Sequence, residues 1–223
     1  MNRARNSTPR RPRTITSTKR TDPGQITPRS RQEWRAWLRQ HHAAASGVWL
    51  RFAKKASGLP TVSYNDAVEE ALCFGWIDGR LHPVDDIFYR QLFTPRKAKS
   101  MWAQSNKTRV ARLIDEGLMT PAGLAAIEAA KACGSWDTLT AAESLTVPPE
   151  LRRAINGSAL AKKHWPGFTE SQRKQFLYYL ASAKRTETRE KRIREIVSHL
   201  ERKIRPGQAE RARARQSARA RQS

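Results

Sequence analysis

The chain has 223 residues, of which 38% are apolar, and a formal net charge of +23 with a sequence pI of about 11.2. A chain of this length forms one domain or two small ones, and this charge favours polyanionic partners such as nucleic acid or anionic lipid. The sequence has no apolar run long enough for a transmembrane segment and no apolar stretch behind its basic N-terminus, which excludes a secretory signal and predicts a cytoplasmic protein.

Both ends of the chain are strongly basic. Residues 1–30 contain eight Lys and Arg against one acid, and residues 203–223 contain seven against one. Because these segments hold almost no apolar side chains, we expect residues 1–30 and 205–223 to be disordered tails. Two interpretations of the tails stay open: they contact nucleic acid or an anionic surface without sequence specificity, or they only keep the protein in solution.

The first half of the region between the tails predicts helices and strands in alternation. Ser30 and Glu33 have capping-box spacing, which predicts a helix over 31–43. Apolar residues alternate in 47–55 and again in 87–96, which predicts two strands. Between them Ser63 caps a predicted helix that runs through 79, where Gly79 supplies a left-handed end.

The second half predicts helices throughout. Ser100 begins one that ends at Gly117, and Pro121 opens another that ends at Gly134. After a connector at 135–149 we expect helices at 149–156, 158–164, 169–183 and 186–204, the last with a clear apolar stripe. The fold class is therefore α+β and predominantly helical, with an α+β core domain at 31–140 and a helical region at 141–204.

No catalytic or metal-binding arrangement is evident. Cys73 and Cys133 lack CxxC spacing, and their apolar surroundings predict two buried free thiols. His41 and His42 occupy adjacent helical positions, which point in different directions. The sequence contains no GxSxG, GxGxxG or phosphate-loop motif, so we expect no catalytic residue, no metal and no cofactor.

The run at 74–79 places Trp76 and Asp78 between two glycines. In the structural interpretation Trp76 lies in the core. In the functional interpretation Asp78 lies at the rim of a cleft, where Asp85 and Asp86 join it in an acidic cluster that holds a cation or a basic ligand.

The run at 93–102 brings three cations next to a predicted helix start. Arg96, Lys97 and Lys99 precede Ser100, and Trp102 follows. Unpaired N–H groups at a helix start attract anions, so this segment predicts an anion site; an ordinary solvated loop is the alternative.

The run at 183–193 is rich in arginine. Arg185, Arg189 and Arg192 are spaced four and three apart and share one helix face, with Lys184 just before them. Such a face can clamp a phosphate or carboxylate with two hydrogen bonds, unless Glu187 and Glu190 already pair these charges.

These motifs in this order resemble the YdeI/OmpD-associated (bacteriocin-protection) family. The resemblance rests on GVWLRFAKK, GWIDG, FTPRKAKSMW, PPELRRAI and AKRTETREKRI, and it extends over about 31–204. It implies a role in protection against antimicrobial peptides or bacteriocins in association with an outer-membrane porin, and a C-terminal helical region at 141–204 of the bacteriocin-protection type. It brings no catalytic residues, and relatives are often described as periplasmic, whereas this chain shows no export signal.

We therefore predict a non-enzymatic binding protein with a role in stress or antimicrobial-peptide resistance. Its partner is a protein or a small anionic ligand. Nucleic acid bound through the basic tails is the alternative, and an enzyme has the least support. The three motifs should converge on one cleft lined by Trp76, Asp78, Asp86, Arg96, Lys97, Ser100, Trp102, Lys184, Arg185 and Arg189.

Overall fold

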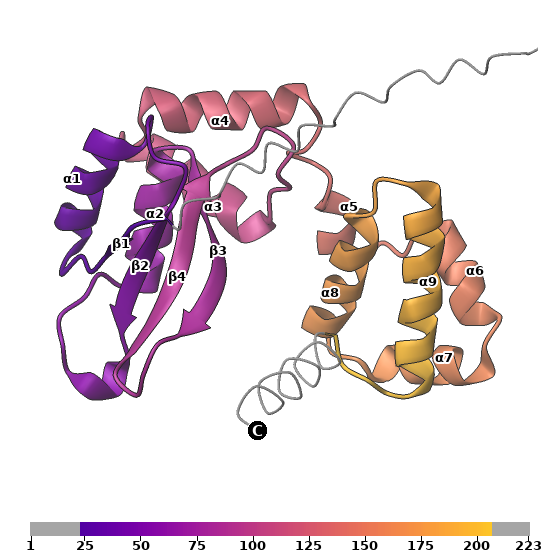
Figure 1. Ribbon diagram of the computed structural model, residues 1–223. Coiled ribbons are helices and arrows are strands. Elements are labelled where there is room, and N and C mark those ends of the chain that lie inside the picture. Colours follow the sequence, from indigo (N-terminus) through magenta and orange to yellow (C-terminus); the bar gives the residue numbers. More distant parts are fainter. Residues whose placement is uncertain (1–22, 207–223) are drawn as a thin grey trace, which may run out of the picture.

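The computed structural model describes residues 23–206, which form two lobes (Figure 1). Residues 1–22 and 207–223 of the predicted tails lie outside these residues. The predicted N-terminal tail of 1–30 extends too far, because residues 25–26 form a short strand and Ile26 packs against the core. The N-terminal lobe contains β1 (Gln25–Ile26), α1 (Arg31–His41), β2 (Val48–Ala53), the 3-10 turn η1 (Lys55–Ser57), α2 (Tyr64–Cys73), β3 (Trp76–Pro83), β4 (Phe88–Pro95), α3 (Gln104–Asp115) and α4 (Pro121–Ala132). The C-terminal lobe contains α5 (Thr140–Glu143), α6 (Pro149–Asn156), α7 (Ala159–His164), η2 (Trp165–Gly167), α8 (Glu170–Ala181) and α9 (Thr186–Glu201).

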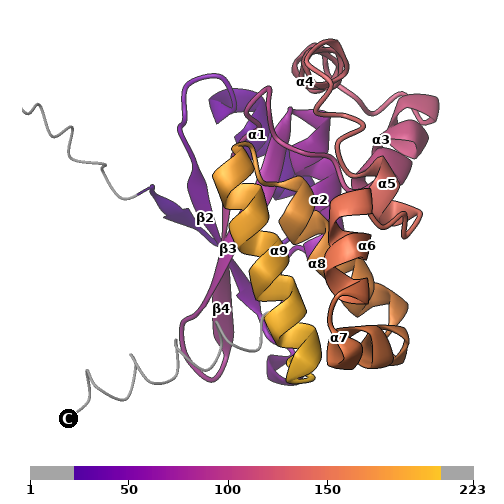
Figure 2. The same ribbon diagram turned by 90° about the vertical axis from the view of Figure 1, so that its right-hand side faces the viewer.

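The N-terminal lobe is built on a mixed sheet with strand order β1-β2-β4-β3. Strands β3 and β4 form an antiparallel hairpin, β4 pairs antiparallel with β2, and β1 runs parallel to β2. Helices α1 to α4 lie on one side of this sheet (Figure 2). The α+β class predicted from the sequence is confirmed.

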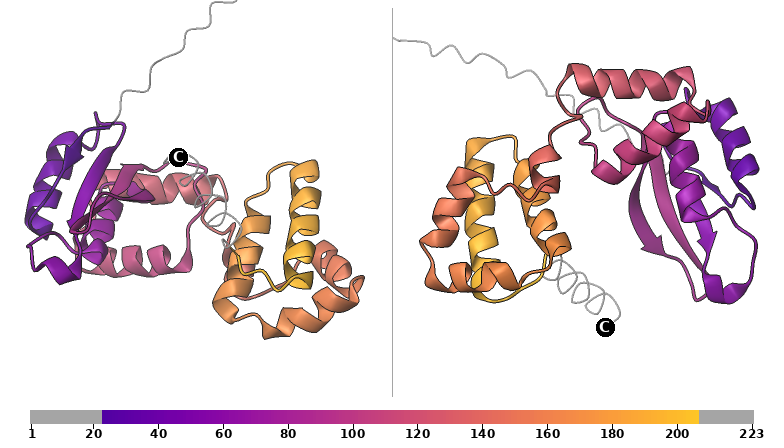
Figure 3. Two further views of the ribbon diagram at one scale, coloured as in Figure 1. Left: turned by 60° about the horizontal axis from the view of Figure 1, so that its bottom comes forward. Right: turned by 180° about the vertical axis from the view of Figure 1, so that it is seen from behind.

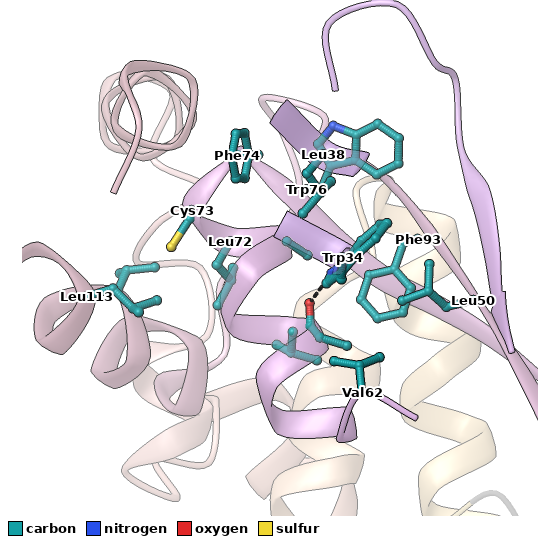
Figure 4. Close-up of a cluster of buried hydrophobic side chains, with 14 of the residues drawn as sticks. Trp34, Leu38, Leu50, Val62, Leu72, Cys73, Phe74, Trp76, Phe93 and Leu113 are labelled. Atoms are coloured by element: carbon teal, nitrogen blue, oxygen red, sulfur yellow. Dashed lines mark hydrogen bonds between the residues drawn. The ribbon is translucent and has the colours of Figure 1, made fainter. Parts of the chain in front are cut away.

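A dense aromatic core fills the space between the sheet and its helices (Figure 4). Trp34, Trp76 and Phe93 are at most 1% exposed, and the indole N–H of Trp34 donates to the carbonyl of Ala67 at 3.0 Å, the dashed line in Figure 4. Burial of three large rings contributes several kcal/mol to folding, at ~25 cal/mol per Å² of apolar area. This core fixes the sheet against α1 and α2.

The predicted helix over 63–79 is wrong in its second half. Helix α2 ends at Cys73, and Gly75 makes the left-handed exit with φ +71. The following residues form β3, where Asp78 pairs with Phe93 on β4, so Gly79 lies within a strand and not at a helix end. The helical spacing of apolar residues concealed this strand, because strand pairing depends on a partner far along the chain.

The helix predicted from Ser100 begins four residues later, at Gln104. Residues 100–103 have no regular structure because Trp102 inserts into the core, where it is 2% exposed. The end at Gly117 is confirmed by its left-handed φ of +65. Consequently the three cations of this motif do not stand directly at a helix start.

The C-terminal lobe matches the sequence prediction closely and has its own core (Figure 3). Helices α6 to α9 begin within one residue of the predicted positions, and α8 starts with a complete capping box between Thr169 and Gln172. The stripe on α9 packs inward through Ile196 and Leu200, which are at most 1% exposed. Within residues 23–206, no helix has the length and apolar character needed to cross a membrane.

Polar contacts fix the connector between the lobes. The Glu143 carboxylate accepts the backbone N–H of Gln104 at 2.9 Å, so the start of α3 is held by an anion from the protein itself. Burial raises the pKa of Glu143, but hydrogen bonds from Tyr178 and from Gln104 outweigh it and hold that pKa below its ordinary value. Lys107 donates to Asp137 at 3.0 Å from the other side. These bonds position the C-terminal lobe beside α3.

Candidate functional site

A cavity of about 680 Å³ lies between the two lobes. Its walls come from the first residues of β3, from the segment that joins β4 to α3, from the connector after α4, and from the end of α8. The lining residues are Ile77, Asp78, Arg96, Lys99, Ser100, Met101, Ala103, Asn106, Cys133, Ser135, Thr138, Leu139, Ala181, Ser182 and Lys184.

Arg96 is the principal cation of this cavity. Its guanidinium lies 3.7 Å from the centre of the Trp102 ring, and its Nη2 donates to the carbonyl of Met101 at 2.9 Å. Its Nε and Nη1 are enclosed and have no hydrogen-bond partner within residues 23–206. Burial lowers the pKa of Arg96 to about 10, although the Asp78 carboxylate acts in the opposite direction. The side chain is thus a cation at neutral pH with two unused N–H donors.

Asp78 places a carboxylate in the same cavity. Its Oδ2 accepts the hydroxyl of Tyr64 at 2.9 Å and the side-chain amide of Gln91 at 2.8 Å. Burial and the nearby Asp78 charge raise the pKa of Tyr64 to about 12, so Tyr64 stays a hydrogen-bond donor. These two donors fix the orientation of the carboxylate.

Cys133 is exposed and lines the cavity, so the prediction that both thiols are buried is correct for Cys73 only. The reason is that Cys133 follows the last residue of α4, at the connector. Its Sγ donates to the Ser135 hydroxyl oxygen at 3.3 Å, and hydrogen bonding with the side chain and backbone of Ser135 holds the pKa of Cys133 below its ordinary value. By contrast, burial raises the pKa of Cys73 to about 11.

The three sequence motifs do converge on this cavity, each through part of its residues. Asp78, Arg96, Ser100 and Lys184 all line it. The two tryptophans do not reach its surface: Trp76 is 1% exposed, with its indole N–H bonded to the carbonyl of His42. Trp102 lies beneath Arg96, and Lys97 is exposed outside the lining.

The acidic cluster expected around Asp78 does not form. Asp78 and Asp86 lie at opposite ends of the β3–β4 hairpin, separated by the length of β3. Asp85 holds the turn instead, because its Oδ1 accepts the backbone N–H groups of Ile87 and Phe88. Within residues 23–206, no group of three or more His, Cys, Asp or Glu side chains is arranged to hold a metal ion.

The arginines of the third motif do not act together on one face, because each has different surroundings. Arg189 donates from Nε to Glu150 at 2.8 Å and lines a second, smaller cavity of about 210 Å³. Arg192 bonds to the carbonyl of Tyr179 at 2.6 Å, and Arg185 lies exposed just before α9. Within residues 23–206, Glu187 and Glu190 form no ion pair with these arginines; Arg189 pairs with Glu150 on α6 and Arg192 bonds to Tyr179 on α8 instead.

The sequence reasoning missed Tyr64, Gln91, Cys133 and Ser135. Gln91 could have been recognised from the sequence, because it is a polar residue at a position of the 87–96 strand where the alternation predicts an inward-facing apolar side chain. In the structure it is 6% exposed. Such a buried amide requires a partner, and here the partner is Asp78. The others are defined by contacts with residues distant in the sequence: Tyr64 bonds to Asp78, and both Cys133 and Ser135 bond to the carbonyl of Ala98.

Two different family models match the two lobes. Residues 26–126 match a domain of unknown function (DUF8412), and residues 144–203 match the family described as bacteriocin-protection, YdeI or OmpD-associated. No curated protein and no solved structure matches the chain. The resemblance seen over 31–204 is thus confirmed for the C-terminal lobe, while a different domain accounts for the N-terminal one. Residues 144–203, which make up most of the C-terminal lobe, are therefore similar to the bacteriocin-protection family described as YdeI- or OmpD-associated.

Proposed function

We propose that this protein is a non-enzymatic binding module that takes a small anionic ligand into the cavity between its lobes. The observation that supports this is Arg96, whose Nε and Nη1 are enclosed without acceptors within residues 23–206. An unmade hydrogen bond on a buried donor costs about 1–3 kcal/mol, and more on a charged group. A ligand oxygen at this position offsets that cost.

The chemistry of the cavity indicates a carboxylate or phosphate group. Oxygens of either group accept charge-assisted hydrogen bonds from a guanidinium, and the Nε and Nη1 atoms of Arg96, which lie on different edges of the group, would each donate separately. Lys99 and Lys184 add positive charge on the walls. The volume of about 680 Å³ is within the ~300–1,000 Å³ typical of small-molecule sites.

Asp78 restricts which anionic ligands the cavity would accept. A carboxylate repels a ligand that is anionic over its whole surface, but it accepts a hydroxyl, amide or ammonium hydrogen. We therefore expect the ligand to carry its anionic group toward Arg96 and a hydrogen-bond donor toward Asp78.

The physiological role we propose is stress or antimicrobial-peptide protection, as the family description suggests. The net charge of +23 disfavours direct capture of cationic peptides, because like charges repel. Protection through recognition of an anionic small molecule is compatible with both the charge and the cavity.

The test is a thermal-shift titration with phosphate, sulfate, citrate and glutamate as probes, at constant ionic strength. Wild-type protein should gain thermal stability with at least one probe, since a ligand that binds only the folded state stabilises it by mass action. Arg96→Met should lose that gain. The matched control is Lys97→Met, which removes one neighbouring charge outside the cavity and should keep it. Equal loss in both variants, or no gain with any probe, contradicts the proposal.

A further inference from the structure

The sheet face turned away from the helices carries two arginines and a histidine at neighbouring positions of three strands. Residues of β2 alternate, so Leu50 and Phe52 enter the core while Trp49 and Arg51 point to the other face. Arg51 pairs directly with Arg90 on β4, and Arg90 pairs with His82 on β3. Three adjacent strands thus place Arg51, Arg90 and His82 in one line, on the sheet face opposite the one that carries the core residues Leu50 and Phe52.

This row is electrostatically unfavourable without an added anion. Like charges directly opposite each other on paired strands destabilise a sheet. One carboxylate compensates in part, since Asp85 lies 3.3 Å from Arg51. Arg90 donates to the neutral amide oxygen of Gln25 at 3.3 Å, and the enclosed Nε of Arg51 has no hydrogen-bond partner within residues 23–206.

Aromatic rings hold both guanidinium groups in place. Arg51 lies 3.6 Å from the centre of the Phe88 ring, and Arg90 lies 4.5 Å from that of Trp49. His82 contacts the edge of the same indole at 5.1 Å between ring centres. A guanidinium with one side on a ring can offer its other side to a ligand, so these two arginines provide stacking planes. The N–H groups that are not bonded to Asp85 or Gln25 are the donors for a phosphate.

We propose that this outer sheet face, formed by Arg51, His82, Phe88 and Arg90, binds single-stranded nucleic acid. Phosphates meet the arginine N–H groups, and bases stack on the guanidinium planes and on His82. A single strand fits better than a duplex, because the face is a strand surface whose stacking planes are usable only by unpaired bases. The high positive charge of the chain adds long-range attraction. The inference is independent of the ligand proposed for the cavity.

The experiment measures fluorescence anisotropy of a labelled 20-nucleotide thymidine oligomer with the full chain at several salt concentrations. Arg51→Gln/Arg90→Gln should weaken binding at least tenfold and reduce the salt slope by about 1.4, since each phosphate contact on a single strand contributes ~0.7. The control, Lys162→Gln/Lys163→Gln, removes the same charge from exposed positions of α7 and should change the dissociation constant less than threefold.

A second variant guards against an effect on folding. Arg90→Gln alone leaves the Arg51–Asp85 ion pair intact and should still weaken binding more than the double control. Equal weakening by the sheet variants and the control would show that only overall charge matters and would overturn the proposal. Binding of a 20-base-pair duplex as tight as that of the single strand, with the same loss in the sheet variants, would also overturn it.

Discussion

Two arginine sites in the N-terminal lobe differ in whether a carboxylate pairs with the arginine. At the junction of α1 and α2, the Glu70 carboxylate is 2% exposed and accepts Arg31 and Arg35 at 2.6 Å each. Glu69 accepts Arg31 at 3.1 Å and also pairs with Arg112 on α3. At the cavity, the described residues offer Arg96 an aromatic ring and one carbonyl, but no carboxylate within ion-pair distance.

We infer that the charges around Glu70 stabilise the fold, whereas the charge of Arg96 is available to a ligand. Around Glu70 the ion pairs join three helices, and although Arg31 Nη2 lacks a partner in residues 23–206, carboxylates surround that guanidinium. At Arg96 the positive charge is fixed in place by neutral groups, and the Asp78 carboxylate acts on it only from beyond ion-pair distance, so an anion in the cavity can still approach it. Removing a charge should therefore lower the stability of the fold strongly at the Glu70 site and hardly at all at Arg96.

The largest effect is expected for Glu70→Gln. This change leaves Arg31 and Arg35 facing a neutral amide in a buried position, and removal of one partner from a buried ion pair costs about 3 kcal/mol or more. Urea unfolding should show this loss of free energy at neutral pH. Glu128→Gln, which breaks an exposed pair with Lys131, is the control and should have a several-fold smaller effect. Equal effects would mean that the Glu70 network is not structural.

The second largest effect is expected for Gly75→Ala, which should lower the free energy of unfolding by about 2 kcal/mol. Gly75 has φ +71, and an added Cβ would lie 2.9 Å from the Ala122 carbonyl on α4. Gly58→Ala is matched in backbone conformation, with φ +65, but its Cβ would meet nothing within 4 Å. Thermal unfolding should therefore rank Gly75→Ala below Gly58→Ala, and the reverse order would contradict the importance of this close approach.

Gly75 also shows where sequence reasoning reached its limit. Caps and apolar stripes are local signals, and they defined the starts of α6 to α9 to within one residue, although the predicted ends of α8 and α9 run two and three residues too far. The exit at Gly75 and strand β3 depend on α4 and β4, which are distant in the chain, so the helix was extended too far. For the same reason Asp78, Arg96 and Lys184 were recognised one motif at a time, while the contribution of Cys133 required the connector to be placed.

A smaller effect, about 1 kcal/mol, is expected for Glu150→Gln, whose partner Arg189 is one-third exposed. Its own backbone N–H and Arg189 hold the pKa of Glu150 below its ordinary 4.5. A carboxyl group with a lowered pKa in the folded state stabilises above its unfolded pKa, and this contribution is lost as the pH falls through the folded value. The difference in thermal midpoint between wild type and variant should thus be full at pH 7 and shrink below about pH 4.5. A difference that is independent of pH would exclude the ion pair as its cause.

The smallest effect on stability should come from Arg96→Met, and it tests the comparison most directly. The change removes a desolvated cation and its bond to the Met101 carbonyl, while a flexible apolar side chain keeps contact with Trp102. Relief of the desolvation and loss of the hydrogen bond oppose each other, so we expect a net change within about 1 kcal/mol of zero. Urea unfolding without added anions measures it. A loss as large as that of Glu70→Gln would show that Arg96 holds the fold in the same way as the α1–α2 network, and the argument that its free N–H groups are kept for a ligand would fail. A near-zero change together with lost anion response would assign Arg96 to binding alone.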